Sequence, residues 1–110
     1  LFVNLMRHAC FLIGNSSCGI FEAPMIPLAV LNVGIRQRDW LAAENVLFAD
    51  YGVENIRKGI KTVLGTDFQS RLNGVRSPYG DGNSIDKAYR LIRDLNFSSY
   101  TYKTEDPLNL

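Results

Sequence analysis

The stretch GNSSCGIFEAP, at residues 14–24, combines residue types that could bind an anionic group. Ser16 and Ser17 stand between two glycines and directly before a segment expected to be helical. The first turn of a helix presents unpaired backbone N–H groups and a partial positive charge, and small residues let a phosphate approach the backbone. The serine hydroxyls can add hydrogen bonds. These features predict a phosphate site, and a helix with an ordinary cap and close packing is the alternative interpretation.

Two charged residues extend this interpretation. Glu22 would repel a phosphate, but its carboxylate could accept two hydrogen bonds from a vicinal diol such as that of a ribose. Arg36 follows a second apolar run, and its guanidinium could neutralise a diphosphate, although an exposed loop arginine is the alternative. Together with the serines, these residues favour a nucleotide over free phosphate. We expect all four side chains to meet in one crevice.

The sequence YGDGN at residues 79–83 is expected to have a structural role. Its two glycines permit positive φ angles, and Asn83 could cap a following helix that has Asp86 in its first turn. A calcium loop of the EF-hand type is excluded because Ile85 stands where an oxygen ligand is required. We therefore expect this segment to turn the chain into its last helix.

Other common catalytic patterns are absent from the sequence. Residues 14–18 lack the final glycine of a nucleophile elbow, and neither the Walker A nor the G-x-G-x-x-G pattern occurs. Cys10 and Cys18 lack metal-ligand spacing, and we expect both to be buried thiols in a reducing cytoplasm. His8 is expected to be an ordinary residue of the first helix. We therefore assign no catalytic residue, no metal ligand and no cofactor.

The elements that must position these groups alternate between short apolar strands and helices, which predicts βαβ units and a parallel sheet. In such a sheet, ligands bind outside the carboxyl ends of the strands, where the serines and the arginine would lie. Three strands are too few for a complete doubly wound domain, so the chain is expected to be a fragment. The expected strands are residues 10–13, buried on both faces, 29–33 and 46–49; the expected helices are residues 2–9, a brief kinked helix from residue 17, 53–64 and 85–95; residues 65–78 and the tail from residue 98 are expected to be loops.

The composition favours an ordinary globular chain. Its 110 residues carry a formal net charge of +1 and are 46% hydrophobic. Basic residues nowhere stand three in a row, which argues against a nucleic-acid partner. Apolar runs stay well below the roughly 18 residues that would indicate a membrane span, and no signal-peptide pattern is visible. We therefore expect a cytoplasmic location.

Four motifs, taken in order, resemble the UDP-N-acetylglucosamine 2-epimerase family, and the resemblance is closest to its hydrolysing branch. They extend over residues 1 to about 96. The motifs are Gly14-Asn15-Ser16-Ser17-x-Gly19-Ile20-x-Glu22-Ala23-Pro24, Asn32-x-Gly34-x-Arg36-Gln37, Glu44-Asn45-Val46 and Pro78-Tyr79-Gly80-Asp81-Gly82-Asn83. The chain departs from the family pattern at Asp39-Trp40, where the family often has Gly-Arg, and at Pro27-Leu28-Ala29, which replaces a usual Gly-x-Pro.

The resemblance implies a GT-B fold, in which two Rossmann-like domains enclose the substrate. Residues 1–96 would form the later part of the C-terminal UDP-binding domain together with its closing helix, and residues 97–110 would form a polar tail. In the family, the closing helix packs back on the partner domain. The apolar face of the last helix is therefore expected to be partly exposed in this chain.

The resemblance also implies roles for the four candidate residues. The family residues that match Ser16 and Ser17 hold the phosphates of UDP, and the glutamate that matches Glu22 holds the ribose. The arginine that matches Arg36 lies at the nucleotide site. These implied roles agree with the chemistry expected from the residues themselves.

The reaction implied for the hydrolysing branch converts UDP-N-acetylglucosamine and water to N-acetylmannosamine and UDP, through elimination of UDP to a glycal and hydration. It belongs to the synthesis of sialic-acid-like sugars. Its acid–base carboxylates lie on the N-terminal domain, so the chain alone is expected to be inactive. The implied partners are UDP, a UDP-N-acetylhexosamine and the missing N-terminal domain, with a homo-oligomer left open. Two alternatives remain: a fragment of a GT-B glycosyltransferase, and a non-catalytic nucleotide-binding module.

Overall fold

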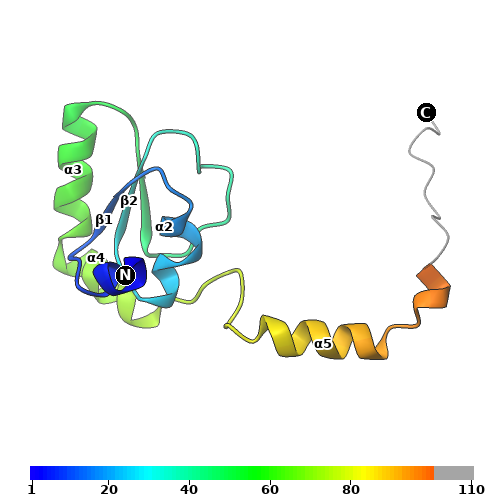
Figure 1. The fold of residues 1–110 in the computed structure, drawn as a ribbon. Helices are drawn as coiled ribbons and strands as arrows, with labels where there is room; N and C mark the ends of the chain where they lie inside the picture. Colours follow the sequence, from blue (N-terminus) through cyan, green and yellow to red (C-terminus); the bar gives the residue numbers. More distant parts are fainter. Residues whose placement is uncertain (101–110) are drawn as a thin grey trace, which may run out of the picture.

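The structure, a computed structural model, describes residues 1–100. A three-stranded parallel sheet lies at its centre (Figure 1). The strands lie in the order β1-β2-β3, with Leu12 paired to Val30 and Val30 paired to Val46. Because the strands are parallel, their carboxyl ends meet at one edge of the sheet. The expected α/β fold is confirmed, and it fits a partial Rossmann-like domain. The strand bounds are β1 Leu12–Gly14, β2 Val30–Val33 and β3 Val46–Ala49.

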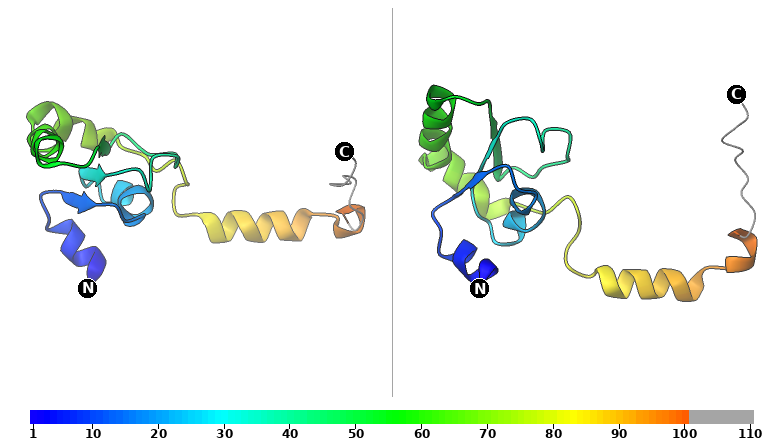
Figure 2. Two further views of the ribbon diagram at one scale, coloured as in Figure 1. Left: turned by 90° about the horizontal axis from the view of Figure 1, so that it is seen from above. Right: turned by 45° about the horizontal axis from the view of Figure 1, so that its top comes forward.

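Helices cover both faces of the sheet, as Figure 2 shows. β2 lies between two apolar cores because successive side chains of a strand point to opposite faces. Leu31 packs with the helices of one face, and Val30 packs with those of the other. The helices of the first face are α3 (Val53–Val63), α4 (Thr66–Arg71) and the 3₁₀ helix η2 (Leu72–Gly74); those of the second are α1 (Phe2–Arg7), α2 (Cys18–Phe21) and the 3₁₀ helix η1 (Ala23–Met25).

The last long helix, α5 (Ser84–Asp94), lies apart from the sheet and its covering helices (Figures 1 and 2). None of its residues is buried, and the apolar side chains of Ile85 and Ile92 are 84% and 60% exposed. The expectation of an exposed apolar face on this helix is therefore confirmed. A 3₁₀ helix, η3 (Phe97–Tyr100), follows, and the remainder of the expected polar tail lies outside the described residues.

The expectation for the first strand was wrong in its burial. The strand begins at Leu12 rather than at residue 10, and Ile13 is 46% exposed. β1 is an edge strand, and only β2 pairs with it among the described residues. The expectation of buried thiols was also wrong, since Cys10, before β1, is exposed and Cys18, at the start of α2, is half-buried.

The expectation of a loop at residues 65–78 was also wrong in part, because α4 and η2 occupy residues 66–74. Phe68 and Leu72 stand four residues apart and are both buried in the core that contains Leu31. Only two apolar positions mark this turn, too few to establish a helical period in the sequence. Burial of these two side chains by the sheet and α3 stabilises the helix.

Candidate functional site

The loop between β1 and α2 presents both candidate serines at the carboxyl edge of the sheet. Ser17 is the N-cap residue of α2, but its backbone is helical and its side chain makes no capping hydrogen bond. The hydroxyl of Ser16 accepts a long hydrogen bond of 3.4 Å from the backbone N–H of Cys18. Both serines are exposed. The cap of this helix is therefore weak, and the Ser17 hydroxyl is not used to form it.

Close packing in this segment comes from Gly19 rather than from the serines. A Cβ atom at Gly19 would lie 2.7 Å from Cγ1 of Val30, so only glycine lets α2 sit this near β2. The packing part of the alternative interpretation is therefore correct. It does not compete with ligand binding, because Gly19 faces the sheet whereas the serines lie at the exposed start of the helix.

Glu22 lies directly after α2, where its backbone N–H donates to the carbonyl oxygen of Cys18. This contact places Glu22 one helical turn, about 5.4 Å, from the start of the helix. Its side chain is exposed, and no ion pair with it is found within residues 1–100. The carboxylate is thus able to accept hydrogen bonds from a ligand that extends along α2.

The loop after β2 carries two arginines that differ in their ion pairing. Arg38 donates to the carboxylate of Asp50, which directly follows β3, and the pair is exposed. Arg36 is also exposed, but it forms no ion pair in the described part of the chain. Arg36 is therefore the arginine of this loop whose charge is available to an anion.

A half-buried hydrogen bond joins the two loops at this edge of the sheet. The side-chain amide of Gln37 donates from Nε2 to the backbone oxygen of Asn15 over 3.2 Å, and Gln37 is only 4% exposed. Gln37 is the neighbour of Arg36, and Asn15 is the neighbour of Ser16. The structure thus brings the serine loop and the arginine loop together. The convergence of all four candidate side chains in one crevice remains a prediction.

Aromatic contacts attach two further loops to α2. The Phe21 ring meets the edge of Trp40 at a centroid distance of 5.4 Å and the ring of Tyr79 at 4.6 Å. Trp40 belongs to the loop after β2, and Tyr79 belongs to the segment before α5. Trp40 thus adds an aromatic contact between the loop after β2 and α2.

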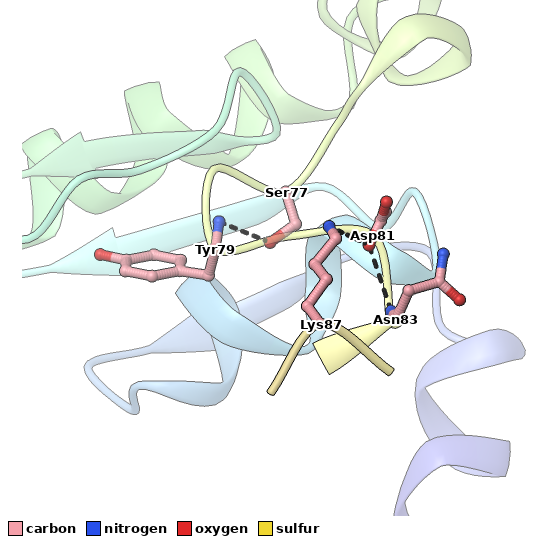
Figure 3. A network of polar contacts seen from close by, with 5 residues as sticks. All are labelled: Ser77, Tyr79, Asp81, Asn83 and Lys87. Atoms are coloured by element: carbon pink, nitrogen blue, oxygen red, sulfur yellow. Dashed lines mark hydrogen bonds and ion pairs between the residues drawn. The ribbon is translucent and has the colours of Figure 1, made fainter. Parts of the chain in front are cut away.

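The segment at residues 79–83 forms a turn held by Asp81, as expected from a structural role (Figure 3). The Asp81 carboxylate accepts hydrogen bonds from Lys87 Nζ over 2.9 Å and from the backbone N–H of Asn83 over 3.1 Å. The Lys87 contact, followed by the Asn83 contact, lowers the pKa of Asp81 from 3.8 to about 2. Asn83 is the N-cap residue of α5, but its side chain forms no cap. The cap expected from Asn83 is therefore not formed, and Asp81 holds the turn through Lys87 and the Asn83 backbone instead.

Two buried amide side chains near the candidate site, those of Asn32 and Gln37, were assigned no role from the sequence. Both stand in the second motif, but a polar residue after an apolar strand is expected on the surface. Their burial depends on how the loops fold over the sheet edge. A cavity of about 530 Å³ lies elsewhere, between η1, the segment before α5 and Lys87, and none of the four candidate residues lines it.

Two further observations concern metals and membranes. Within residues 1–100, no three side chains of His, Cys, Asp or Glu gather in a way that could hold a metal ion. Each helix in the same range is too short or too polar to cross a lipid bilayer. His8 directly follows α1 and is exposed. Within residues 1–100, its side chain forms no hydrogen bond with a candidate residue.

Comparison with known proteins decides the family. The sequence model of the UDP-N-acetylglucosamine 2-epimerase family matches residues 1–93 of the 110. The chain belongs to this family. Two relatives match most of the chain: the polysialic acid biosynthesis protein P7 of Escherichia coli is 30% identical over 84% of it, and a hydrolysing UDP-N,N'-diacetylbacillosamine 2-epimerase of Legionella pneumophila is 31% identical over 89%.

A third relative, the UDP-N-acetylglucosamine 2-epimerase of Neisseria meningitidis serogroup B, is 38% identical over 54% of the chain. The matched regions make up 24%, 25% and 16% of the three relatives. The chain thus spans about a quarter or less of the length of these relatives. The family therefore includes hydrolysing members, and at least one relative is named for polysialic acid biosynthesis.

Proposed function

We propose that this chain is the UDP-binding part of a hydrolysing UDP-N-acetylglucosamine 2-epimerase, within the C-terminal Rossmann-like domain of a GT-B fold. The full-length protein would convert UDP-N-acetylglucosamine and water to N-acetylmannosamine and UDP in the cytoplasm. Family membership and the hydrolysing relative support this reaction type. The relative named for polysialic acid biosynthesis supports a place in the synthesis of sialic-acid-like sugars.

The observation that carries the proposal is the contact between the two loops at the carboxyl edge of the sheet. The Gln37–Asn15 hydrogen bond holds Arg36, which has an available charge, in the loop beside that of the exposed serines. An arginine and hydroxyl donors at the start of a helix form a suitable environment for a diphosphate. Glu22, one turn along α2, would accept hydrogen bonds from the hydroxyls of the ribose.

In the proposed reaction, the chain stabilises the leaving group. Elimination breaks the bond between C1 of the sugar and the diphosphate oxygen, and the electron pair leaves with UDP. Donors and a positive charge placed at the diphosphate favour this charge separation more in the transition state than in the substrate. The removal of the C2 proton and the addition of water to the glycal require acid–base groups, which we assign to the part of the protein outside this chain.

The test of this function is incubation of the full-length protein that contains this chain with UDP-N-acetylglucosamine. We expect release of free UDP and N-acetylmannosamine in equal amounts, measured by chromatography, whereas residues 1–110 alone give no release. Formation of UDP-N-acetylmannosamine without free UDP would contradict the hydrolysing assignment. Turnover only with UDP-N,N'-diacetylbacillosamine would contradict the proposed substrate, and turnover by residues 1–110 alone would contradict the division of roles.

A further inference from the structure

Two buried amide side chains lie at the carboxyl edge of the sheet, beside the proposed diphosphate site. Asn32 is fully buried in β2, and Gln37 is 4% exposed in the loop that follows. In the described residues, four buried side-chain polar atoms lack a hydrogen-bond partner, and three of them belong to this pair: Nδ2 and Oδ1 of Asn32, and Oε1 of Gln37. Burying polar atoms without partners costs free energy, so their concentration at one edge requires a reason.

The backbone places Asn32 under the serine loop. Asn32 is the register partner of Gly14, the last residue of β1. It also shares a face of the sheet with Val30, because side chains two residues apart in a strand point the same way. Since α2 packs on Val30 through Gly19, the Asn32 amide lies towards the start of that helix. The unpaired amide atoms of Asn32 therefore lie beside the proposed diphosphate site.

Gln37 connects the two halves of the site directly. Its Nε2 donates to the backbone oxygen of Asn15 over 3.2 Å, across 22 positions of the sequence. The residue before Gln37 is Arg36, and the residue after Asn15 is Ser16. This half-buried hydrogen bond thus links the guanidinium-bearing loop to the hydroxyl-bearing loop.

We propose that Gln37 is a positioning residue for the diphosphate of the nucleotide. Its amide holds the serine loop at the distance from Arg36 at which the hydroxyls and the guanidinium contact the same diphosphate. This inference rests on the proposed function, because the ligand is the same. Gln37 itself need not touch the nucleotide, since its effect passes through the loop carbonyl of Asn15.

The test compares calorimetric titrations of UDP into the full-length protein and into its Gln37→Met variant. Methionine has a similar length but cannot donate to the Asn15 oxygen. A displaced serine loop would lose hydrogen bonds to the charged diphosphate, so we expect UDP to bind at least about tenfold more weakly. Gln37→Glu, which keeps the length but also lacks the donor at neutral pH, is expected to weaken UDP binding to at least the same extent.

Asn45 provides a matched control. It is fully buried, its Nδ2 donates to the Leu28 oxygen over 2.9 Å, and it lies at the opposite end of the strands. Asn45→Leu therefore removes another hydrogen bond from a side-chain amide to a backbone oxygen, away from the site. We expect this variant to lower the thermal unfolding temperature at least as much as Gln37→Met while it leaves the UDP dissociation constant within about twofold. Equal weakening of UDP binding by the two variants would reduce Gln37 to a structural role and overturn the inference.

A double variant separates positioning from direct binding. If Gln37 acts through its alignment with Arg36, Gln37→Met should add little to the loss already caused by Arg36→Ala. Full additivity of the two losses would contradict the inference. Unchanged UDP binding in Gln37→Met would overturn the positioning role and leave the proposed function intact, whereas failure of the unaltered protein to bind UDP would contradict the proposed function itself.

Discussion

Replacement of Arg36 by alanine is expected to weaken UDP binding by the full-length protein about 10- to 100-fold. A hydrogen bond to a charged group contributes roughly 1.5–3 kcal/mol, and each 1.4 kcal/mol corresponds to about a factor of ten in the dissociation constant. Arg36 is exposed and has no ion pair within the described residues, so its charge is available to a diphosphate. Calorimetric titration with UDP measures the effect.

Arg38 is the matched control for this prediction. It lies in the same loop, but its guanidinium is paired with Asp50. Arg38→Ala removes the same formal charge at a position two residues away, and we expect it to change UDP affinity by less than about threefold, in line with the small value of exposed ion pairs. Similar losses of UDP affinity in the two variants would indicate a general charge effect rather than direct binding of the diphosphate by Arg36. Arg36→Lys should give an intermediate loss, because an ammonium group cannot form the bidentate contact.

Replacement of Gly34 by alanine is expected to destabilise the fold by roughly 2–3 kcal/mol. Gly34 follows β2 with a φ angle of +90°, a backbone conformation that costs an alanine about 1–2 kcal/mol. The added Cβ would also lie 2.4 Å from the ring of Tyr51, which must then move. Thermal unfolding of the full-length protein should show a midpoint lowered by several degrees.

Gly74→Ala is the control for the loss of a glycine as such, because a Cβ atom at this position meets no atom within 4 Å. Its effect on the unfolding temperature should be small. Tyr51→Ala removes the ring that collides with the new side chain, so Gly34→Ala in that background should cost only the backbone strain. An unchanged unfolding temperature in the single Gly34→Ala variant would contradict the close approach of the Tyr51 ring to the β2 loop.

The strands β2 and β3 and the long helices could be predicted from the sequence because their own residues determine them. The apolar run of β3 and the helical spacing of α3 indicated these elements at almost the observed bounds. The partial burial of β1 could not be predicted in this way, since it depends on which strands lie beside it. The helix α4 was missed because only Phe68 and Leu72 mark its buried face.

The candidate site could be predicted as a set of residue types but not as an arrangement. The sequence shows two arginines after β2, and only the folded loop determines that Arg38 rather than Arg36 pairs with Asp50. The role of Gln37 depends on a contact with a backbone oxygen 22 positions away, which no local pattern encodes. The same reason applies to the aromatic contact of Trp40, which becomes visible only when Phe21 is placed beside it.

The most direct test of a nucleotide site, as opposed to a site for phosphate alone, is a titration of the Glu22→Ala variant with UDP and with inorganic phosphate. The exposed carboxylate lies one turn along α2 from the serines, and only UDP offers it a ribose diol. Loss of the hydrogen bonds to this charged group should weaken UDP binding roughly tenfold. Binding of inorganic phosphate should stay the same or become slightly tighter, because a negative charge has been removed. Equal weakening of both ligands would contradict the assignment of Glu22 to the ribose and, with it, the nucleotide site.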